Sequence, residues 1–235
     1  MTKDVSDTHS PIGEVHMIKA ETMQSRVHAQ LRDLLMLGRF QPGQALKIFE
    51  LAQAFGTSIQ PVRESIRQLV TERALEAMPN RSARVPHLTV ERLRDLKRVR
   101  MALEGLAAEL AAERITADEI MALRSYCAAE AAADDSGDVE ASVQQNMRFH
   151  FTLYRAAGSP TLMPLIESLW LQIGPWVRQS AESFDGAEGR GTMMHRLAIE
   201  ALEKGDAAGV RRAIEDDITR TFDLVMASTG AAAAT

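Results

Sequence analysis

Residues 48–86 constrain the fold of this chain more than any other segment. A short apolar-periodic stretch, IFELAQAF, ends at Gly56, and Ser58 then stands where an N-cap would begin a second helix, IQPVRESIRQLVTERA. Pro61 falls in the first turn of that helix, where its missing N–H costs little. Two extended runs, LEAM and ARVP, follow and flank a PNRS turn, which predicts a small hairpin.

An amphipathic helix precedes this segment. Val27, Leu31, Leu34 and Leu35 recur at helical spacing, and the stripe stops in GRFQPG, where glycine and proline favour a turn. Three helices, a tight turn between the second and third, and a hairpin together describe a winged helix-turn-helix over residues 19–86.

The rest of the chain shows the helical period alone. Breaks such as GSP, KGDAA and FDGAEGRG separate its periodic stretches. We therefore expect a mostly α-helical protein whose second domain, residues 92–228, is an all-helical bundle reached through a linker at 87–91. Residues 1–18 and 229–235 are expected to be flexible tails. The expected helices of the bundle span residues 89–114, 116–133, 138–157, 160–181, 190–204 and 206–227.

Charge is distributed unevenly between the two domains. The net charge is −5, but Lys19 to Pro86 carries ten Lys and Arg against six Asp and Glu, whereas His87 to Thr235 carries sixteen against twenty-three. A basic module joined to an acidic one favours nucleic-acid binding by the first. No apolar run approaches the roughly 18 residues of a membrane span, and the polar N-terminus predicts no signal peptide. With Cys127 as the only cysteine, we expect a cytoplasmic protein without membrane contact or internal disulfide.

The second helix of the turn motif suits the major groove of DNA. Its apolar residues, from Val62 to Val70, fall on one side and leave polar side chains on the other. A helix N-terminus also favours a phosphate, and the hairpin arginines could reach a neighbouring phosphate or the minor groove. The alternative to DNA binding is that this helix face is merely exposed to solvent, since its arginines and glutamates alternate at helical spacing. The candidate DNA contacts are Lys47, Ser58, Gln60, Arg63, Arg67, Arg81 and Arg84.

The stretch from LLMLGRFQPGQ through FELAQAFGTSIQPVRESI to PNRSARVP carries a family pattern over about sixty residues. It resembles the GntR family of bacterial transcription regulators, with the P-G turn, E-L-A, P-V-R-E and P-N-R landmarks in place. The resemblance implies a homodimer that binds two-fold-related half-sites of a double-stranded DNA operator. It also implies that the DNA-contacting positions are Ser58, Ile59, Gln60, Pro61 and Arg63, with wing residues around Arg81.

The chain departs from this pattern at three positions. Many members carry arginine where this chain has Phe49 and Ile59, and the wing turn has Ser82 in place of the usual glycine. An isoleucine cannot hydrogen-bond to guanine, but it can contact a thymine methyl group. We therefore expect an operator that differs from the commonest family consensus.

Three stretches of the helical domain, RVRMALEGLAAELAA, NMRFHFTLYRAAGSP and HRLAIEALEKGDAAG, resemble the FCD ligand-binding domain of FadR-type GntR regulators, in its shorter, six-helix VanR-like form. The usual metal ligands of that family are an Asp and a His spaced as D-x-x-x-H, a second His, and a third His twenty-two residues later. The matching positions here are Asn146, His150, His195 and Asp217. The chain therefore replaces the aspartate by an amide and the last histidine by a carboxylate.

Two imidazoles with one carboxylate suit Zn, Ni, Mn or Fe(II) with open coordination positions, whereas an amide oxygen is a weaker ligand. The resemblance implies that this divalent metal holds a small organic-acid effector, with Arg100 as a second anchor and Tyr154 in the pocket wall. The alternative is that His150 and His195 are buried, hydrogen-bonded histidines without a metal. Arg100 could equally do no more than pair with Glu104 one turn away.

Together these features favour a sequence-specific DNA-binding transcriptional regulator, a repressor, whose operator affinity changes when the effector binds. One rival is a metal-dependent helical-bundle enzyme, and the winged module argues against it. Another rival is a regulator whose metal is purely structural. We expect no enzymatic activity.

Overall fold

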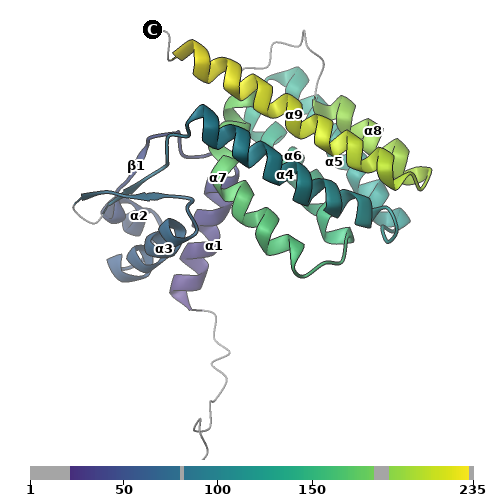
Figure 1. Cartoon of the computed structure of the whole chain (residues 1–235). Coiled ribbons are helices and arrows are strands. Elements are labelled where there is room, and N and C mark those ends of the chain that lie inside the picture. Colours follow the sequence, from purple (N-terminus) through teal and green to yellow (C-terminus); the bar gives the residue numbers. More distant parts are fainter. Residues whose placement is uncertain (1–21, 80–81, 183–190, 233–235) are drawn as a thin grey trace, which may run out of the picture.

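The computed structural model describes residues 22–79, 82–182 and 191–232. Within them the chain forms two modules that lie side by side (Figure 1), which confirms the mostly α-helical fold class. The smaller module contains α1 (Met23–Met36), β1 (Ala45–Leu46), α2 (Ile48–Ala54), α3 (Ile59–Thr71), β2 (Glu76–Ala77) and β3 (Ala83–Arg84). The larger module contains α4 (Val90–Ala111), α5 (Ala117–Ser136), α6 (Val139–Ala156), α7 (Leu162–Glu182), α8 (Gly191–Glu203) and α9 (Ala207–Ala232).

Helix α3 carries its apolar residues on one face, as its periodicity predicted. Val62, Ile66 and Leu69 are buried in one cluster with Leu31 and Leu35 of α1. An amphipathic helix that buries one face this way keeps the opposite face free for solvent or a partner. The fold therefore leaves the polar side of α3 outside the core.

The wing is a three-stranded sheet in the order β1-β3-β2, with both pairings antiparallel. The β2–β3 hairpin was predicted, although its strands are shorter than the expected runs at 75–78 and 83–86. Strand β1 was not predicted, because two residues are too few to show a period of two. Backbone hydrogen bonds from Gly43 N–H to Val85 O and from Val85 N–H to Gln44 O hold it against β3.

Two helices of the larger module run three or more residues past their expected ends. Helix α5 continues beyond residue 133 to Ser136, because the stop is Gly137, whose φ of 72° suits glycine. Its start follows the expected capping box of Thr116 and Glu119. Helix α9 continues beyond residue 227 to Ala232, in a stretch rich in alanine, the strongest helix former. Residues 229–232, expected to belong to a flexible tail, are therefore helical.

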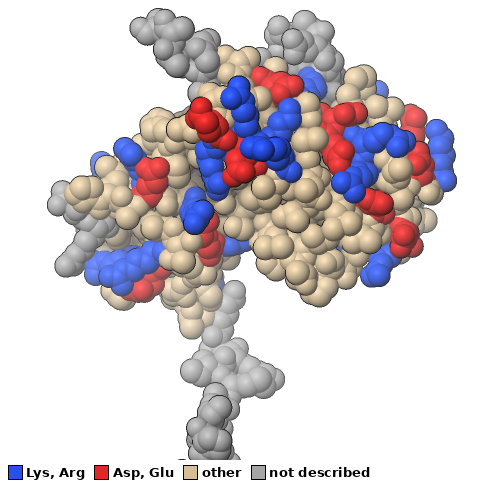
Figure 2. Space-filling view, in the orientation of Figure 1, with Lys and Arg blue, Asp and Glu red and all other residues tan. Residues whose placement is uncertain are grey.

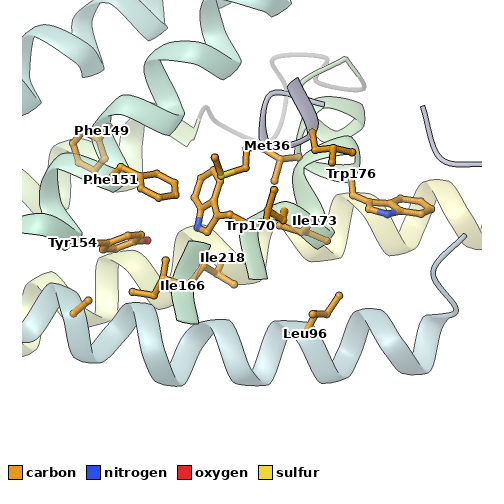
Figure 3. Packing of buried hydrophobic residues seen from close by; sticks show 14 of the residues in the cluster. Met36, Leu96, Phe149, Phe151, Tyr154, Ile166, Trp170, Ile173, Trp176 and Ile218 are labelled. Atoms are coloured by element: carbon orange, nitrogen blue, oxygen red, sulfur yellow. The ribbon is translucent and has the colours of Figure 1, made fainter. Parts of the chain in front are cut away.

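The core of the larger module is built along α4, α6, α7 and α9. Helix α4 lies along α9, and α5 along α6 (Figure 1). Figure 3 shows Tyr154, Ile166 and Trp170 pointing into the space between these helices, and all three are essentially buried. In the part of the chain that the structure describes, no helix has the length and apolarity of a bilayer span.

The smaller module rests on α7 through a close backbone contact. At Gly174, a Cβ atom would lie 2.1 Å from the carbonyl oxygen of Leu35 and 2.7 Å from that of Met36. Only glycine leaves room for the end of α1 at this point. Pro175 follows directly inside α7. The same helix carries Trp170 one turn earlier, so α7 joins the two modules.

Ion pairs reinforce this junction on both sides. Arg32 of α1 reaches Glu72 at the end of α3 (2.8 Å) and Glu167 of α7 (3.1 Å). Glu140 at the start of α6 accepts from Arg39 (2.7 Å) and from Arg178 of α7 (2.6 Å). The half-exposed pairs contribute little individually, but they fix the orientation in which α1 meets α7.

Candidate functional site

The outer face of α3 is polar, and its side chains are only partly engaged with one another. Gln60 donates to Glu64 (3.0 Å), and Arg67 pairs with the same carboxylate (3.0 Å). Ser58 is the N-cap of α3 but makes no side-chain capping bond. Among the described residues no carboxylate pairs with Arg63, and its buried Nε atom has no hydrogen-bond partner. Ser58 and Arg63 therefore keep hydrogen-bonding capacity for an external ligand.

A hollow of about 500 Å³ separates this face from the wing. Lys47, at the start of α2, is exposed and pairs with Glu50 (2.7 Å), and Arg84 pairs across the wing with Glu76 (2.9 Å). Figure 2 shows Lys and Arg side chains spread over this module next to a smaller number of carboxylates. Arg81 lies outside the described residues, so its predicted DNA contact stays a prediction. The hollow is lined by Ile48, Arg63, Ile66, Arg67, Val70, Thr71, Ala77, Met78 and Ser82.

The second candidate site is a buried triangle of His150 from α6, His195 from α8 and Asp217 from α9. Their ligand atoms all lie within 4.8 Å of one another. His150 Nε2 is 3.2 Å from His195 Nε2 and 3.3 Å from Asp217 Oδ2. All three residues are buried. The structure thus brings together the three predicted metal positions that carry an imidazole or a carboxylate.

The hydrogen-bond network assigns which nitrogen of each ring carries its proton. His195 Nδ1 lies 2.9 Å from Glu130 Oε2, and a carboxylate can only accept, so Nδ1–H donates. Tyr154 donates its own hydroxyl proton to Glu104 Oε2 (2.7 Å), so its oxygen accepts from His150 Nδ1–H at 3.0 Å. In the neutral form of each ring, Nε2 therefore carries a bare lone pair; the two Nε2 atoms lie 3.2 Å apart, and that of His150 lies 3.3 Å from Asp217 Oδ2.

The charges around the triangle are strongly coupled. Burial alone would raise the pKa of Asp217, but the two histidines and Arg100 outweigh it and hold that pKa below its usual range. Burial lowers the pKa of the His195 ring, but Glu130 and then Asp217 reverse this and raise it. Asp217 is consequently ionised, and His195 Nε2 attracts either a second proton or a cation.

Two of the three separations in this donor set fit a divalent metal, and the third, between His195 and Asp217, is at most 4.8 Å. Two ligand atoms that each lie about 2.0–2.2 Å from a metal are about 3.0–3.5 Å apart along one edge of its coordination shell. The separations of 3.2 Å and 3.3 Å at His150 fall in this range. Glu130 and Tyr154 supply the outer hydrogen bonds that usually orient metal-bound imidazoles. His150, His195 and Asp217 could therefore hold such an ion.

Asn146, the fourth predicted ligand, lies one turn before His150 on α6. It lines a cavity of about 70 Å³ beside Asp217. Arg220, three residues after Asp217 on α9, borders the same cavity. The remaining lining combines hydroxyl and carboxylate groups with aliphatic ones: Glu130, Asp134, Ser142, Val143, Val177, Ser180, Ala181, Thr221 and Leu224.

Arg100 and Tyr154 are not among the residues that line this cavity. Arg100 is buried and grips Glu104 with two nitrogens, at 2.5 Å and 3.0 Å. Trp170 Nε1 also donates to Glu104 (3.1 Å). The pairing of Arg100 with Glu104, the alternative to an effector contact, is thus present. Neither Arg100 nor Tyr154 borders the cavity, so their predicted contacts with an effector stay predictions.

Glu130 is the site residue that sequence reasoning missed. It lies in SYCAAEAAA, where alanines obscure the pattern. Leu123, Cys127 and Ala133 are the buried residues of α5 nearest in helical register, and Glu130 is the carboxylate among them. A lone acid on the buried stripe of a helix needs a partner, and this signal could have found it.

Comparison with known proteins supports both modules. The model of the bacterial regulatory proteins of the gntR family matches residues 23–85, and the FCD domain model matches residues 95–220. The HTH-type transcriptional regulator McbR of Escherichia coli K12 is 30% identical over 85% of this chain and 90% of its own length. A probable D-xylose utilization operon transcriptional repressor of Paenarthrobacter nicotinovorans is 29% identical, over 78% of this chain and 81% of its own.

A solved structure agrees with these sequence matches. The structure of E. coli McbR/YncC superposes with a TM-score of 0.83 at 28% identity, over 89% of this chain and 100% of that one. These relatives are transcriptional regulators, which supports the expectation that the chain is not an enzyme. On this evidence the chain belongs to the GntR family of bacterial transcriptional regulators, with an N-terminal helix-turn-helix domain and a C-terminal FCD domain.

Proposed function

We propose that this chain is a homodimeric cytoplasmic repressor whose operator affinity is set by a small carboxylate bound beside a divalent metal. The observation that carries the metal is the convergence of two bare Nε2 atoms and one ionised carboxylate in a buried space. Three electron-pair donors that face one another without a shared proton repel unless a cation lies between them. Zn, Ni, Mn or Fe(II) suits this donor set.

When bound, the metal would supply a Lewis-acidic centre for an effector carboxylate or a water molecule. The chain's own residues would then orient the two imidazoles and select the effector by its size. Glu130 and Tyr154 hold the two imidazoles in the tautomer that binds. Burial and the neighbouring Glu104 raise the pKa of Tyr154 well above its ordinary value, so Tyr154 remains a hydroxyl donor to Glu104. Asn146 and Arg220 line the adjoining cavity, whose small volume favours a short carboxylate.

Coupling to DNA would pass through α7. Trp170 joins the Glu104 network that steadies His150, and Gly174 on the same helix supports the end of α1. A ligand that shifts α7 would therefore change how the helix-turn-helix module is held. A coupling of about 1–3 kcal/mol changes operator affinity about 5- to 150-fold. The repressor assignment is supported by the relative from Paenarthrobacter nicotinovorans, which its description names a probable operon repressor.

A thermal-shift screen tests the site. The full-length protein, loaded with Zn²⁺, is screened against acetate, glycolate, lactate and other small carboxylates, with and without a chelator. A bound ligand raises the melting temperature by mass action. We expect a carboxylate hit that disappears with chelator and in His195→Ala, and that persists in Cys127→Ala. Stabilisation by the metal with no carboxylate response would support a purely structural metal, and no metal response at all would overturn the metal site.

A further inference from the structure

Two large apolar side chains of the helix-turn-helix module are exposed where α2 and α3 begin. Phe49, the second residue of α2, is 70% exposed, and Ile59, the first residue of α3, is 40% exposed. Exposing them to water forgoes the stabilisation that burial would give. Neither belongs to the buried core cluster or to the partly buried residues that pack against it. Single exposed apolar residues are common on protein surfaces, so it is the position of these two that points to a contact.

Ile59 stands at the N-terminal end of α3, the end of a recognition helix that contacts base edges, and Phe49 stands at the start of α2, the helix that crosses the DNA backbone. Ile59 shares one stripe of α3 with Arg63 and Arg67, at successive spacings of four residues. Ile48, the neighbour of Phe49, borders the same hollow as these two arginines. Lys47 adds a cation at the start of α2. Apolar side chains set among phosphate-binding cations fit the major groove better than they fit another protein.

The chemical groups on the major-groove edges decide which base an apolar side chain can contact favourably. The 5-methyl group of thymine is the apolar group on the major-groove edges of the four base pairs. Neither side chain can hydrogen-bond to guanine, and covering guanine O6 and N7 would leave these acceptors without partners. We propose that Ile59 and Phe49 read thymine by packing on its 5-methyl group. Each operator half-site then has a thymine opposite Ile59 and another opposite Phe49, flanked by the base pairs that Gln60 and Arg63 contact.

Replacing thymine by uracil tests this directly, because uracil lacks only the methyl group. Operators are first selected from a random duplex pool with the full-length protein. Each thymine of the consensus half-site is then replaced by uracil in turn, and affinities are measured at fixed salt. We expect at least two positions where uracil weakens wild-type binding about three- to fivefold, the effect of one buried methyl group. In Ile59→Ala one of these positions becomes insensitive to uracil, and in Phe49→Ala the other does.

The control is Met121→Ala, which removes an apolar side chain of similar exposure, 60%, from α5 in the other domain. It should leave every uracil effect unchanged. The proposal fails if uracil costs nothing at any wild-type position, a result that needs no variant to fold. It also fails for either residue whose alanine variant keeps the wild-type uracil profile, and for Phe49 that outcome would assign the exposed ring to a protein contact. Absence of any selected consensus would instead contradict sequence-specific DNA binding.

Discussion

The Nε2 atoms of His150 and His195 face each other at 3.2 Å, although the opposite nitrogen of each ring already donates a hydrogen bond. The ring of His195 lies against Glu130 and that of His150 against Tyr154. Without a cation, this arrangement is relieved only when one ring takes up a second proton. The site is therefore a place where a metal and a proton compete for the same atom.

Glu130→Gln tests the hydrogen bond between His195 Nδ1 and Glu130. The amide keeps the shape but removes the charge that orients and polarises His195. We expect the affinity for Zn²⁺ to fall about 10- to 100-fold, as is typical when an outer partner of a metal-bound histidine is lost. Competition with a chromophoric chelator measures it. Glu113→Gln, which neutralises an exposed carboxylate at the end of α4, is the matched control and should bind as the wild type does. If Glu130→Gln and the wild type bound Zn²⁺ with equal affinity, Glu130 would not contribute to the metal site.

Metal affinity should depend on pH through His195. Burial lowers the pKa of its ring, but Glu130 and Asp217 outweigh this and raise it above 6.5, the ordinary value for a histidine. The protonated ring cannot bind a metal, so affinity should rise with pH until the solution passes the raised pKa, and then level off. Titrations of the full-length protein from pH 6 to 8.5 measure the profile. A flat profile across this interval would contradict the hydrogen bond assigned to Glu130.

The same raised pKa has a consequence for stability without metal. A raised pKa in the folded state stabilises the fold below the unfolded value and stops doing so as the pH rises through the folded one. Asp217, with a lowered pKa, acts in the opposite sense and loses its contribution as the pH falls through its folded value. Metal-free protein should therefore be most stable in the interval between these two transitions. Urea unfolding of the metal-free protein, measured at a series of pH values, locates this interval of greatest stability.

Asn146→Asp should strengthen metal binding. The substitution gives α6 a charged oxygen one turn from His150, and carboxylates bind divalent metals more strongly than amides do. We expect Zn²⁺ or Mn²⁺ affinity to rise by about an order of magnitude. Gln145→Glu adds the same charge at the preceding residue, which does not border the cavity, and serves as the control. An equal gain in both variants would mean that net charge, and not ligation, is responsible.

Gly174→Ala should weaken the junction between the modules. The new methyl group would meet backbone oxygens of Leu35 and Met36, which cannot move aside as a side-chain tip can. We expect a loss of about 1–3 kcal/mol in the free energy of unfolding, together with weaker operator binding. Gly105→Ala is the control, since its Cβ would meet the flexible end of Glu215. If both substitutions cost the same, close packing on α7 is not what positions α1.

Most of the fold follows from the chain's periodicity, and the limits of the prediction are local. The recognition helix was predictable because Val62, Ile66 and Leu69 repeat at helical spacing and are all buried. Strand β1 was not, since its pairing with β3 is decided by contacts far apart in sequence. The end of α5 at Ser136 required knowing that Gly137, and not the preceding aspartates, stops the helix.

The residues of the candidate site were likewise predictable only in part. His150, His195 and Asp217 were found through family spacing, and the fold brings them together. Glu130 could not be found that way, because its partner His195 lies 65 positions away and on another helix. The cavity wall also depends on tertiary packing. The family resemblance pointed to Arg100, whose contact with an effector stays a prediction, and the cavity is bordered by Arg220 of α9.

Operator binding measured with and without the effector tests the central claim most directly. The DNA affinity of Zn²⁺-loaded protein is titrated in the absence and presence of the carboxylate that stabilises it. We predict that the carboxylate changes operator affinity about 5- to 150-fold in the wild type, and not at all after chelation or in His195→Ala. An undiminished response in His195→Ala or in chelated protein would contradict the account.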